Sequence, residues 1–339
     1  MNTWKMRAFG AFILAAASAS CAGSSQTDDR QSAATDSQTS TTAVLGAFNA
    51  DSAYNFIAQQ VAFGPRVPGT QGHTMCRDYI VNTLRRVGAD SIIVQNATVK
   101  AYTGETLPIS NIIAGFNTEN ARRILLVAHW DTRPWADMES STELRNQPIT
   151  GANDGGSGVG VLLEIARNLA QKRPGVGVDL LFVDAEDYGS NDGFGTHADS
   201  WCLGSQYWVE NIVPYSADNL PVYGILLDMV GGRDARFHYE AYSLHHAETP
   251  TLKVWSEAER LGYGDRFIKA IGGAATDDHV VLTKGGIPTT DIIEINNVET
   301  STFPPTWHTH SDNLENIDRA TLKAVGETVL NVVYKEKPY

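Results

Sequence analysis

The hydrophobic residues of this chain follow two alternating spacings from about residue 48 onward. Apolar side chains at every third or fourth position predict helices at 54–61, 76–87, 159–171, 205–211, 246–261 and 319–334. Continuous apolar runs of strand length predict strands at 91–99, 111–116, 123–129, 178–184, 223–227 and 287–292. This alternation predicts an α/β fold: a single domain with a mixed but mostly parallel central sheet and helices on both faces.

The N-terminal part of the chain has a different composition. Lys5 and Arg7 precede a short apolar stretch, and small residues follow it, which predicts an export signal over 1–20. That stretch is too short to span a bilayer. Residues 21–47 are mostly Ser, Thr, Asp, Gln and Ala without an apolar period, so we expect a disordered tether. The folded domain is expected over 48–339.

The three cysteines bear on the cellular compartment. Cys21 directly follows small residues, as in bacterial lipoproteins, although Ser18 stands where leucine is usual. A lipid anchor at Cys21 and free secretion therefore both stay open, and either predicts export to the periplasm or cell envelope. In an exported protein, Cys76 and Cys202 predict a disulfide, with two buried thiols as the alternative.

The charge balance limits the kinds of partner. The formal net charge is −13 with 42% hydrophobic residues, and it becomes more negative once Lys5 and Arg7 are removed. An acidic protein is poorly suited to nucleic acid or to an anionic membrane surface. We therefore expect no nucleic-acid partner and membrane contact only through a lipid anchor. The charge suits a substrate with a free amino group, and the sequence does not indicate an oligomeric state.

Acidic and imidazole side chains follow several of the apolar runs. The run VDLLFVDAED ends in Glu186 and Asp187, and others lead to His129, Asp154, Asp228 and His308. Open α/β sheets bind ligands at the carboxyl ends of their strands, where these groups would meet. Adjacent residues point in different directions, so one acid can hold a metal while its neighbour transfers protons. Carboxylates and imidazoles together suit zinc with an open coordination position.

Six motifs extend this picture: AHWDTRPWAD, GANDGGSG, VDAED, LLDMVGG, TDDH and TWHTHSDNLENID. Their order over residues 50–335 resembles the zinc-dependent aminopeptidase superfamily, and more closely its glutaminyl cyclase branch, the animal-type glutaminyl-peptide cyclotransferases. The resemblance implies one Zn²⁺ per chain, held by Asp154, Asp187 and His308. The animal enzymes have Glu-Glu where this chain has Glu186-Asp187. The shorter acid still offers a carboxylate, but it changes the reach to the metal.

The resemblance also implies an activity and the residues that perform it. The branch cyclises the N-terminal glutamine of peptides or proteins to pyroglutamate and releases ammonia. Glu186 corresponds to the general acid/base, and Asp228 and Asp277 to two acids that form a hydrogen-bond network with it. Trp307 corresponds to the tryptophan before the last zinc ligand, and with Trp201 it would form an aromatic substrate pocket.

Two other functions fit the same residues. In a two-zinc aminopeptidase, His129 and Asp228 would hold a second metal, Asp154 would bridge both metals, and Glu186 would activate a water. Asp131, two positions after His129, is interpreted as an acid that orients that imidazole from outside the metal site. A zinc-holding envelope lipoprotein without catalysis is the third alternative, and the intact Glu186 argues against it.

Overall fold

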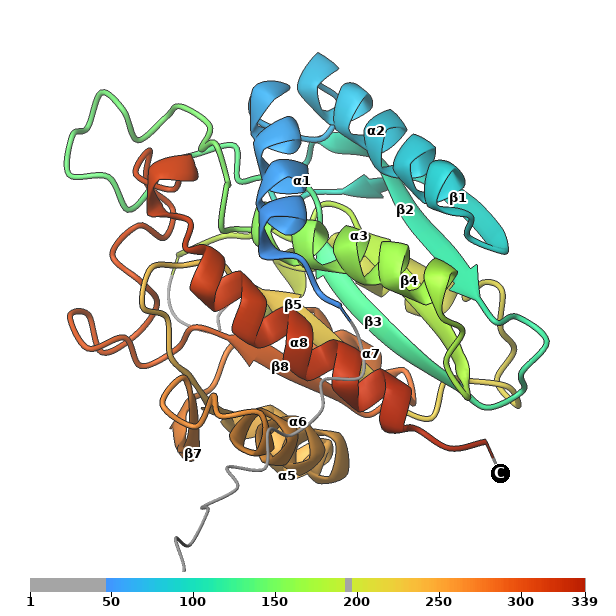
Figure 1. Cartoon of the computed structure of the whole chain (residues 1–339). Helices are drawn as coiled ribbons and strands as arrows, with labels where there is room; N and C mark the ends of the chain where they lie inside the picture. The colour runs from blue at the N-terminus through green and yellow to red at the C-terminus, as the bar shows by residue number, and fades with distance from the viewer. Residues whose placement is uncertain (1–46, 193–196, 339) are drawn as a thin grey trace, which may run out of the picture. The chain divides into compact units, whose positions relative to one another are not determined.

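Residues 47–192 and 197–338 are described by the computed structural model of this protein (Figure 1). The predicted export signal, Cys21 and almost all of the tether lie outside this part. No helix within it is both long and apolar enough to cross a membrane. The α-helices are α1 Ala50–Ala62, α2 Gln71–Val87, α3 Gly156–Gln171, α4 Leu203–Glu210, α5 Ala241–His246, α6 Glu248–Arg260, α7 Asp278–Lys284 and α8 Arg319–Lys335. Two short 3₁₀ helices are η1 Ala198–Ser200 and η2 Leu314–Asn316.

The described chain contains a six-stranded sheet in the order β1-β2-β4-β3-β5-β8. Strands β4, β3, β5 and β8 are parallel, whereas β1 and β2 form an antiparallel edge. A separate pair, β6-β7, is also parallel. The strands are β1 Ser91–Lys100, β2 Thr106–Phe116, β3 Arg123–His129, β4 Gly177–Val183, β5 Gly224–Asp228, β6 Phe237–Glu240, β7 Phe267–Gly273 and β8 Thr289–Ile293.

Helices cover both faces of the large sheet. Leu126 and Phe182 pack into the core shared with α1, α2, α3, α6 and α8. Leu125 and Leu181 point to the opposite face, where residues of α4 and α7 such as Trp208 and Leu282 cover them. Strands buried on both faces read as continuous apolar runs, which is why the sequence revealed them. The predicted fold, a mostly parallel sheet between helices, is confirmed (Figure 1).

The region around residues 237–273 holds elements beyond those predicted. The helix expected at 246–261 is present as α6, and the additional short helix α5 precedes it, with Ala247 at φ −136° and ψ 43° between them. The carboxylate of Glu240 caps α5 by accepting the backbone N–H groups of Tyr242 and Ser243. Strands β6 and β7 were not expected, because β7 is half-exposed and shows no regular apolar alternation.

The predicted disulfide is wrong, since both cysteines are free buried thiols. Cys76 lies on α2, beneath one face of the sheet, and burial raises the pKa of its thiol to about 12. Cys202 directly precedes α4, which covers the opposite face. A disulfide requires Cα atoms about 4.4–6.8 Å apart, and the sheet separates these two helices.

The parallel strands bring their carboxyl ends to one edge of the sheet. Strand β3 ends at His129 and β5 at Asp228, while β4 ends just before Glu186. Asp154 and His308 were also expected at strand ends, but they lie in loops. Asp154 lies in the turn before α3, and His308 lies in the loop between β8 and η2. Three strand ends and two loops therefore supply the side chains gathered at this edge.

Candidate active site

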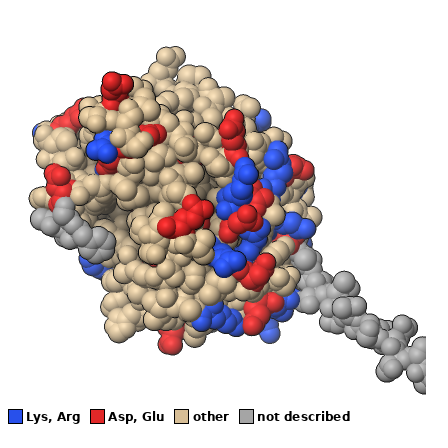
Figure 2. Space-filling view, turned by 90° about the vertical axis from the view of Figure 1, so that its left-hand side faces the viewer, with Lys and Arg blue, Asp and Glu red and all other residues tan. Residues whose placement is uncertain are grey.

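A cavity of about 340 Å³ opens at this edge of the sheet. Its lining includes Asp154, Glu186, Asp187, Trp201, Asp228, Asp277, Phe303, Trp307 and His308. In the space-filling view from this side, the surface is hollowed within a region that shows few charged side chains (Figure 2). The acids expected in the site are thus collected inside a cavity rather than spread over the surface.

Three of these residues form a compact set of metal donors. His308 Nε2 lies 3.2 Å from Asp187 Oδ1 and 3.7 Å from Asp154 Oδ2. One donor atom from each residue lies within 4.8 Å of the other two, and all three residues are buried. Asp187 Oδ2 is buried without a hydrogen-bond partner. Two carboxylates, one imidazole and an unsatisfied buried oxygen fit a zinc ion.

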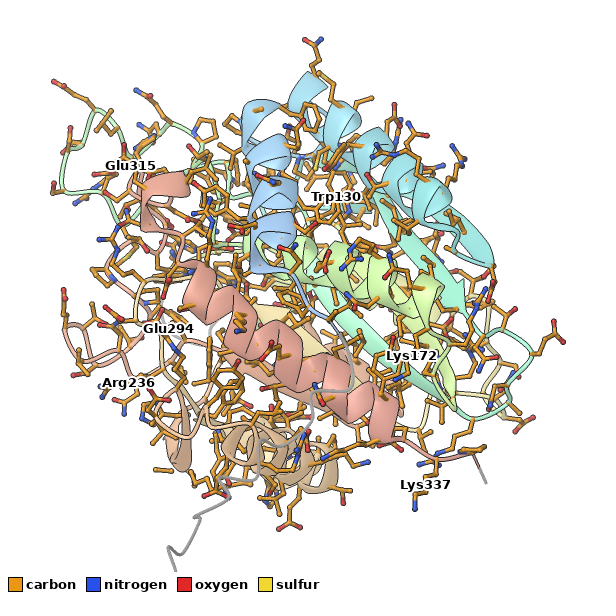
Figure 3. All side chains as sticks on the ribbon, in the orientation of Figure 1. Trp130, Lys172, Arg236, Glu294, Glu315 and Lys337 are labelled. Carbon is orange, nitrogen blue, oxygen red and sulfur yellow. The ribbon has the colours of Figure 1, made fainter. Side chains whose placement is uncertain are left out.

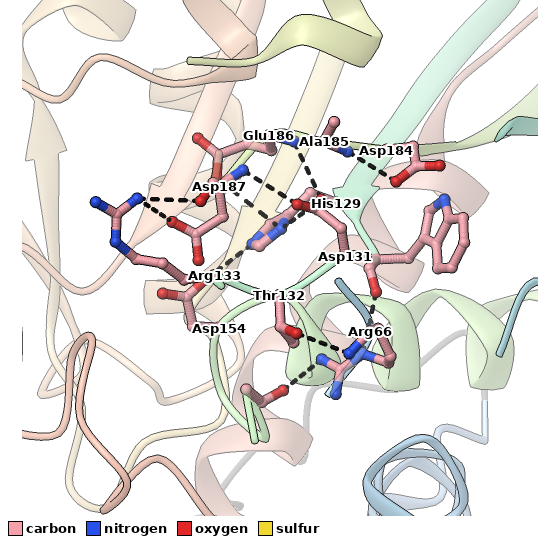
Figure 4. Close-up of polar contacts among 12 residues, drawn as sticks. Arg66, His129, Asp131, Thr132, Arg133, Asp154, Asp184, Ala185, Glu186 and Asp187 are labelled. Atoms are coloured by element: carbon pink, nitrogen blue, oxygen red, sulfur yellow. Dashed lines mark hydrogen bonds and ion pairs between the residues drawn. The ribbon is translucent and has the colours of Figure 1, made fainter. Parts of the chain in front are cut away.

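Asp131 fixes the backbone that carries the two adjacent acids (Figure 4). Its Oδ1 accepts the N–H of Glu186 at 3.1 Å, and its Oδ2 accepts the N–H of Asp187 at 3.2 Å. The same carboxylate lies 3.4 Å from His129 Nδ1. Asp131 follows β3 and the acids follow β4, so one side chain ties two neighbouring strand ends together.

The turn that carries Asp154 is held by a residue that the sequence analysis missed. Asp312 accepts the backbone N–H groups of Asn153 at 2.7 Å and Asp154 at 3.1 Å. Burial and the nearby Asp154 charge raise the pKa of Asp312 to about 7. Gly155 lets this turn approach His129, because an added Cβ would lie 2.7 Å from its ring. The only available signal was Asp312's place within the last motif.

Asp137 and Arg133 also support the site without having been predicted. Asp137 Oδ1 lies 3.1 Å from His308 Nδ1, the ring nitrogen turned away from Asp154 and Asp187. Arg133 donates to both oxygens of Asp137, at 2.9 and 2.6 Å. Burial alone would raise the pKa of Asp137, but its hydrogen bonds to His308 and Arg133 hold it well below the usual value. A carboxylate on the outer nitrogen of a metal-binding histidine fixes the ring and its tautomer.

A second set of donors shares one residue with the first. His129 Nε2 lies 3.0 Å from Asp154 Oδ1 and 3.2 Å from Asp228 Oδ1. One donor atom from each of these residues lies within 4.8 Å of the others. Burial opposes the charged imidazole, but hydrogen bonds to Asp131, Asp154 and Asp228 raise the pKa of His129 well above its usual value. The geometry required by the two-metal alternative is therefore also present.

Glu186 lies beside the donor sets in a strongly acidic environment. Burial raises its pKa well above the usual value, and the charges of Asp187 and Asp277 add to this despite the opposing effect of His129. Burial likewise raises the pKa of Asp228, to about 7, and that of Asp277. A raised pKa makes the carboxylate a stronger base and lets its acid form persist, so such a group can accept a proton and return it within one reaction.

Aromatic rings border His308 on the cavity side. Trp307 stacks on its imidazole at 3.7 Å between centroids, and the Trp201 ring lies 6.1 Å away and nearly parallel. Arg133 lies over Trp201 at 4.8 Å. Both tryptophans line the cavity, as expected. Trp130, by contrast, is fully buried between helices and sheet (Figure 3).

Several site residues adopt a backbone conformation that side chains rarely tolerate. Positive φ angles occur at Ala185, Cys202, Met229 and His308. The first precedes Glu186, the third follows Asp228, and the last is itself a zinc-ligand candidate. Such strain costs of order 1–3 kcal/mol per residue and concentrates at functional sites. These positive φ angles turn the backbone at this edge of the sheet in directions that an ordinary strand-to-helix turn does not take.

Comparison with known proteins first defines the class. The sequence profile of peptidase family M28 matches residues 111–333. The chain belongs to this family.

Similar proteins then define the branch. Glutaminyl cyclase of Bacteroides thetaiotaomicron, solved with N-acetylhistamine bound, is 49% identical with a TM-score of 0.82, covering 86% of this chain and 99% of that one. Glutaminyl-peptide cyclotransferase of Bos taurus is 25% identical over 76% of this chain and 74% of its own length. A structure described as a leucine aminopeptidase precursor, from B. thetaiotaomicron, is 48% identical with a TM-score of 0.80, covering 86% and 98%. Within family M28 the chain groups with bacterial glutaminyl cyclases, which confirms the resemblance seen in its motifs.

Proposed function

We propose that this protein cyclises the N-terminal glutamine of peptides or proteins to pyroglutamate and releases ammonia. The observation that carries the proposal is the position of Glu186. It lies at the wall of a cavity that also holds the Asp154, Asp187 and His308 donor set and the two tryptophans. The similarity to glutaminyl cyclases supports the same reaction.

Asp154, Asp187 and His308 would hold one zinc ion in this proposal. When bound, zinc would polarise the oxygen of the side-chain amide and stabilise the negative charge that develops on it. Asp137 holds the His308 ring in place through the other ring nitrogen, 3.1 Å away. Asp131 holds the backbone of Asp187. The protein thus presents the ligands already oriented, and little reorganisation is needed during the reaction.

Glu186 would move the one proton that the reaction requires. The neutral α-amine attacks the side-chain amide carbon, a C–N bond forms, and the amine gives one proton to Glu186. The bond from that carbon to the amide nitrogen then breaks, and Glu186 returns the proton so that ammonia leaves. Burial and the neighbouring acids raise the pKa of Glu186, which makes both directions of transfer accessible near neutral pH.

The aromatic walls would fold the substrate into its reactive shape. Ring closure requires the glutamine side chain to curl back toward its own amine, and a confined pocket supplies that orientation. Trp307 and Trp201 line the cavity, and Phe303 packs against Trp307 at 4.6 Å between centroids. These rings also exclude water, which would otherwise compete for the amide carbon.

Mass spectrometry of two peptides tests the proposal. Peptides that begin with Gln or with Leu are incubated with the zinc-loaded protein, and the products are weighed. We expect the Gln peptide to lose one ammonia and the Leu peptide to stay intact. Loss of a whole N-terminal residue from either peptide would contradict cyclisation.

A two-zinc aminopeptidase is the second candidate function. It is favoured by the His129, Asp154 and Asp228 set, which shares Asp154 with the first donor set. The solved structure described as a leucine aminopeptidase precursor points the same way. Measuring zinc per chain separates the two functions, because cyclisation as proposed needs one ion and the peptidase needs two.

The proposed location is the cell envelope. The export signal over 1–20 and the lipoprotein-like Cys21 support it. Exported proteins with N-terminal glutamine would then be the substrates. Expression in a Gram-negative host with a labelled fatty acid tests the anchor. Label on the wild-type chain that is absent from Cys21→Ser is expected, and an unlabelled wild-type chain would favour free secretion.

A further inference from the structure

A second cluster of ionisable groups lies deeper than the cavity, behind Asp277. Asp277, His279 and Asp291 each place one donor atom within 4.8 Å of the other two. His279 and Asp291 are fully buried, whereas Asp277 also lines the cavity. Asp277 is close to Glu186 as well, because these two residues and Cys202 form another group within the same distance limit. The buried cluster therefore touches the catalytic acids from behind.

His279 lies between two carboxyl groups. Its Nε2 is 3.0 Å from Glu240 Oε2, and its Nδ1 is 3.4 Å from Asp291 Oδ2. Among the described residues, both ring nitrogens of His279 and both oxygens of Asp291 are buried without a well-aligned hydrogen bond, so these ion-pair contacts are what compensates them. Unpaired buried polar groups are costly, so these side chains depend on one another. Together with Asp277 they form a continuous row of four ionisable residues.

Glu240 is the fixed end of this row. Its oxygens accept backbone N–H groups from Tyr242 at 3.0 Å, Ser243 at 2.6 Å and Ala275 at 3.2 Å. Burial opposes the charge, but the hydrogen bond to His279 and these backbone donors lower the pKa of Glu240 to about 2. Glu240 is therefore a carboxylate, and the 3.0 Å contact pairs it with the Nε2 side of the His279 ring.

We propose that Glu240 and His279 are positioning residues which, through Asp291, hold the carboxyl group of Asp277 against Glu186. This inference rests on the proposed cyclase function. Asp277 and Asp291 lie side by side in this group, and a shared proton would hold the two carboxyl groups together, because like charges resist ionising side by side. His279 keeps Asp291 oriented for that sharing. Without it, Asp291 would lose its partner, and Asp277 would lose the direction in which it faces Glu186.

Kinetic measurements on His279→Gln and Glu240→Gln test whether these two residues position Asp277. We expect kcat for a Gln peptide to fall about 10- to 100-fold, as for residues that orient catalytic groups from behind. KM should stay within about threefold and zinc per chain should not change, because neither residue touches substrate or the metal donors. The double variant should lose no more than the worse single variant, since residues acting in series are not additive.

The matched control breaks a buried ion pair at the other end of the sheet. Arg123 donates to both oxygens of Asp179 at 2.6 Å, near the start of β3 and β4. Asp179→Asn should lower Tm while kcat stays within about twofold of wild type. A His279→Gln protein that keeps wild-type kcat would overturn the proposal. If that variant does not fold, Glu240→Gln decides by the same criterion. Loss of one metal ion per chain in either variant would also overturn it, in favour of a cation bound by Asp277, His279 and Asp291.

A measurement without substrate separates this inference from the proposed function. Proton NMR should show a strongly downfield N–H resonance that disappears in His279→Gln and shifts in Asp277→Asn. A shift in Asp277→Asn would demonstrate the connection through Asp291. If the wild-type protein released no ammonia, that second result would contradict only the proposed function. If the resonance did not respond to Asp277→Asn, the proposed coupling from Glu240 through His279 and Asp291 to Asp277 would be overturned, whatever the activity of the protein.

Discussion

At the scale of single residues, Glu186 allows the sharpest test of the proposed chemistry. Glu186→Gln keeps the size of the side chain but cannot take up a proton at neutral pH. We expect zinc per chain to remain at the wild-type value and turnover of a Gln peptide to fall about 10²–10⁴-fold. Metal analysis and initial rates on the same preparation check both parts. Near-normal turnover would remove Glu186 from the proton transfer.

Gly189 tests the position of Trp201. An added Cβ at Gly189 would lie 2.0 Å from the Trp201 ring, so Gly189→Ala must displace the indole. We expect KM for a Gln peptide to rise several-fold and the tryptophan fluorescence to change. Gly264→Ala is the control, because its nearest side-chain neighbour would be 3.9 Å away. Equal KM values for both variants would show that Trp201 does not contribute to binding.

At the scale of elements, the loop after β3 and the loop before η2 meet in two similar carboxylate–imidazole pairs. Asp137 faces His308 at 3.1 Å, and Glu139 faces His310 at 3.1 Å. Only His308 belongs to a donor set. Asp137→Asn should therefore weaken zinc affinity about 10- to 100-fold in a chelator competition, whereas Glu139→Gln should leave it unchanged. Equal affinities in the two variants would contradict this role of Asp137.

The start of α5 gives a prediction about pH. The pKa of Glu240 is about 2 in the folded protein, below its ordinary value of 4.5. Its stabilising contribution, roughly 3 kcal/mol, is therefore complete above about pH 4.5 and is lost as pH falls toward 2. The free energy of unfolding should differ between wild type and Glu240→Gln at pH 6, and this difference should shrink at pH 3. A difference independent of pH would contradict the assignment.

At the scale of the whole molecule, metal binding should stabilise the fold. Asp154 and Asp187 lie close together and repel one another without a cation between them. Removing zinc with a chelator should lower Tm, and adding zinc at about 100 times its Kd should restore about 3 kcal/mol. Asp187→Asn, which loses a ligand, should respond much less. A wild-type Tm indifferent to zinc would argue against the donor set.

The sequence predicted the sheet better than the supports of the site. Strand β3 was predicted with its observed bounds, because a strand buried on both faces is a continuous apolar run. Asp154, Asp187 and His308 were expected together from the resemblance and lie together. Asp137 and Asp312 were missed because the site residues that they hold, His308 and Asp154, are 158 or more residues away along the chain. The predicted disulfide was wrong because the spacing of two cysteines along the sequence does not reveal which face of the sheet each helix covers.

Asp131 fixes peptide groups rather than acid side chains, and this bears on the aspartate found where the animal enzymes carry a second glutamate. With both N–H groups held on one carboxylate, the main chain at Glu186 and Asp187 keeps its course whichever acid stands second. The shorter Asp187 would then present its carboxylate one carbon nearer the strand, while Glu186 keeps its position. Asp187→Glu would extend that carboxylate toward the pocket, and the proposed ring closure would respond to a change of a single methylene.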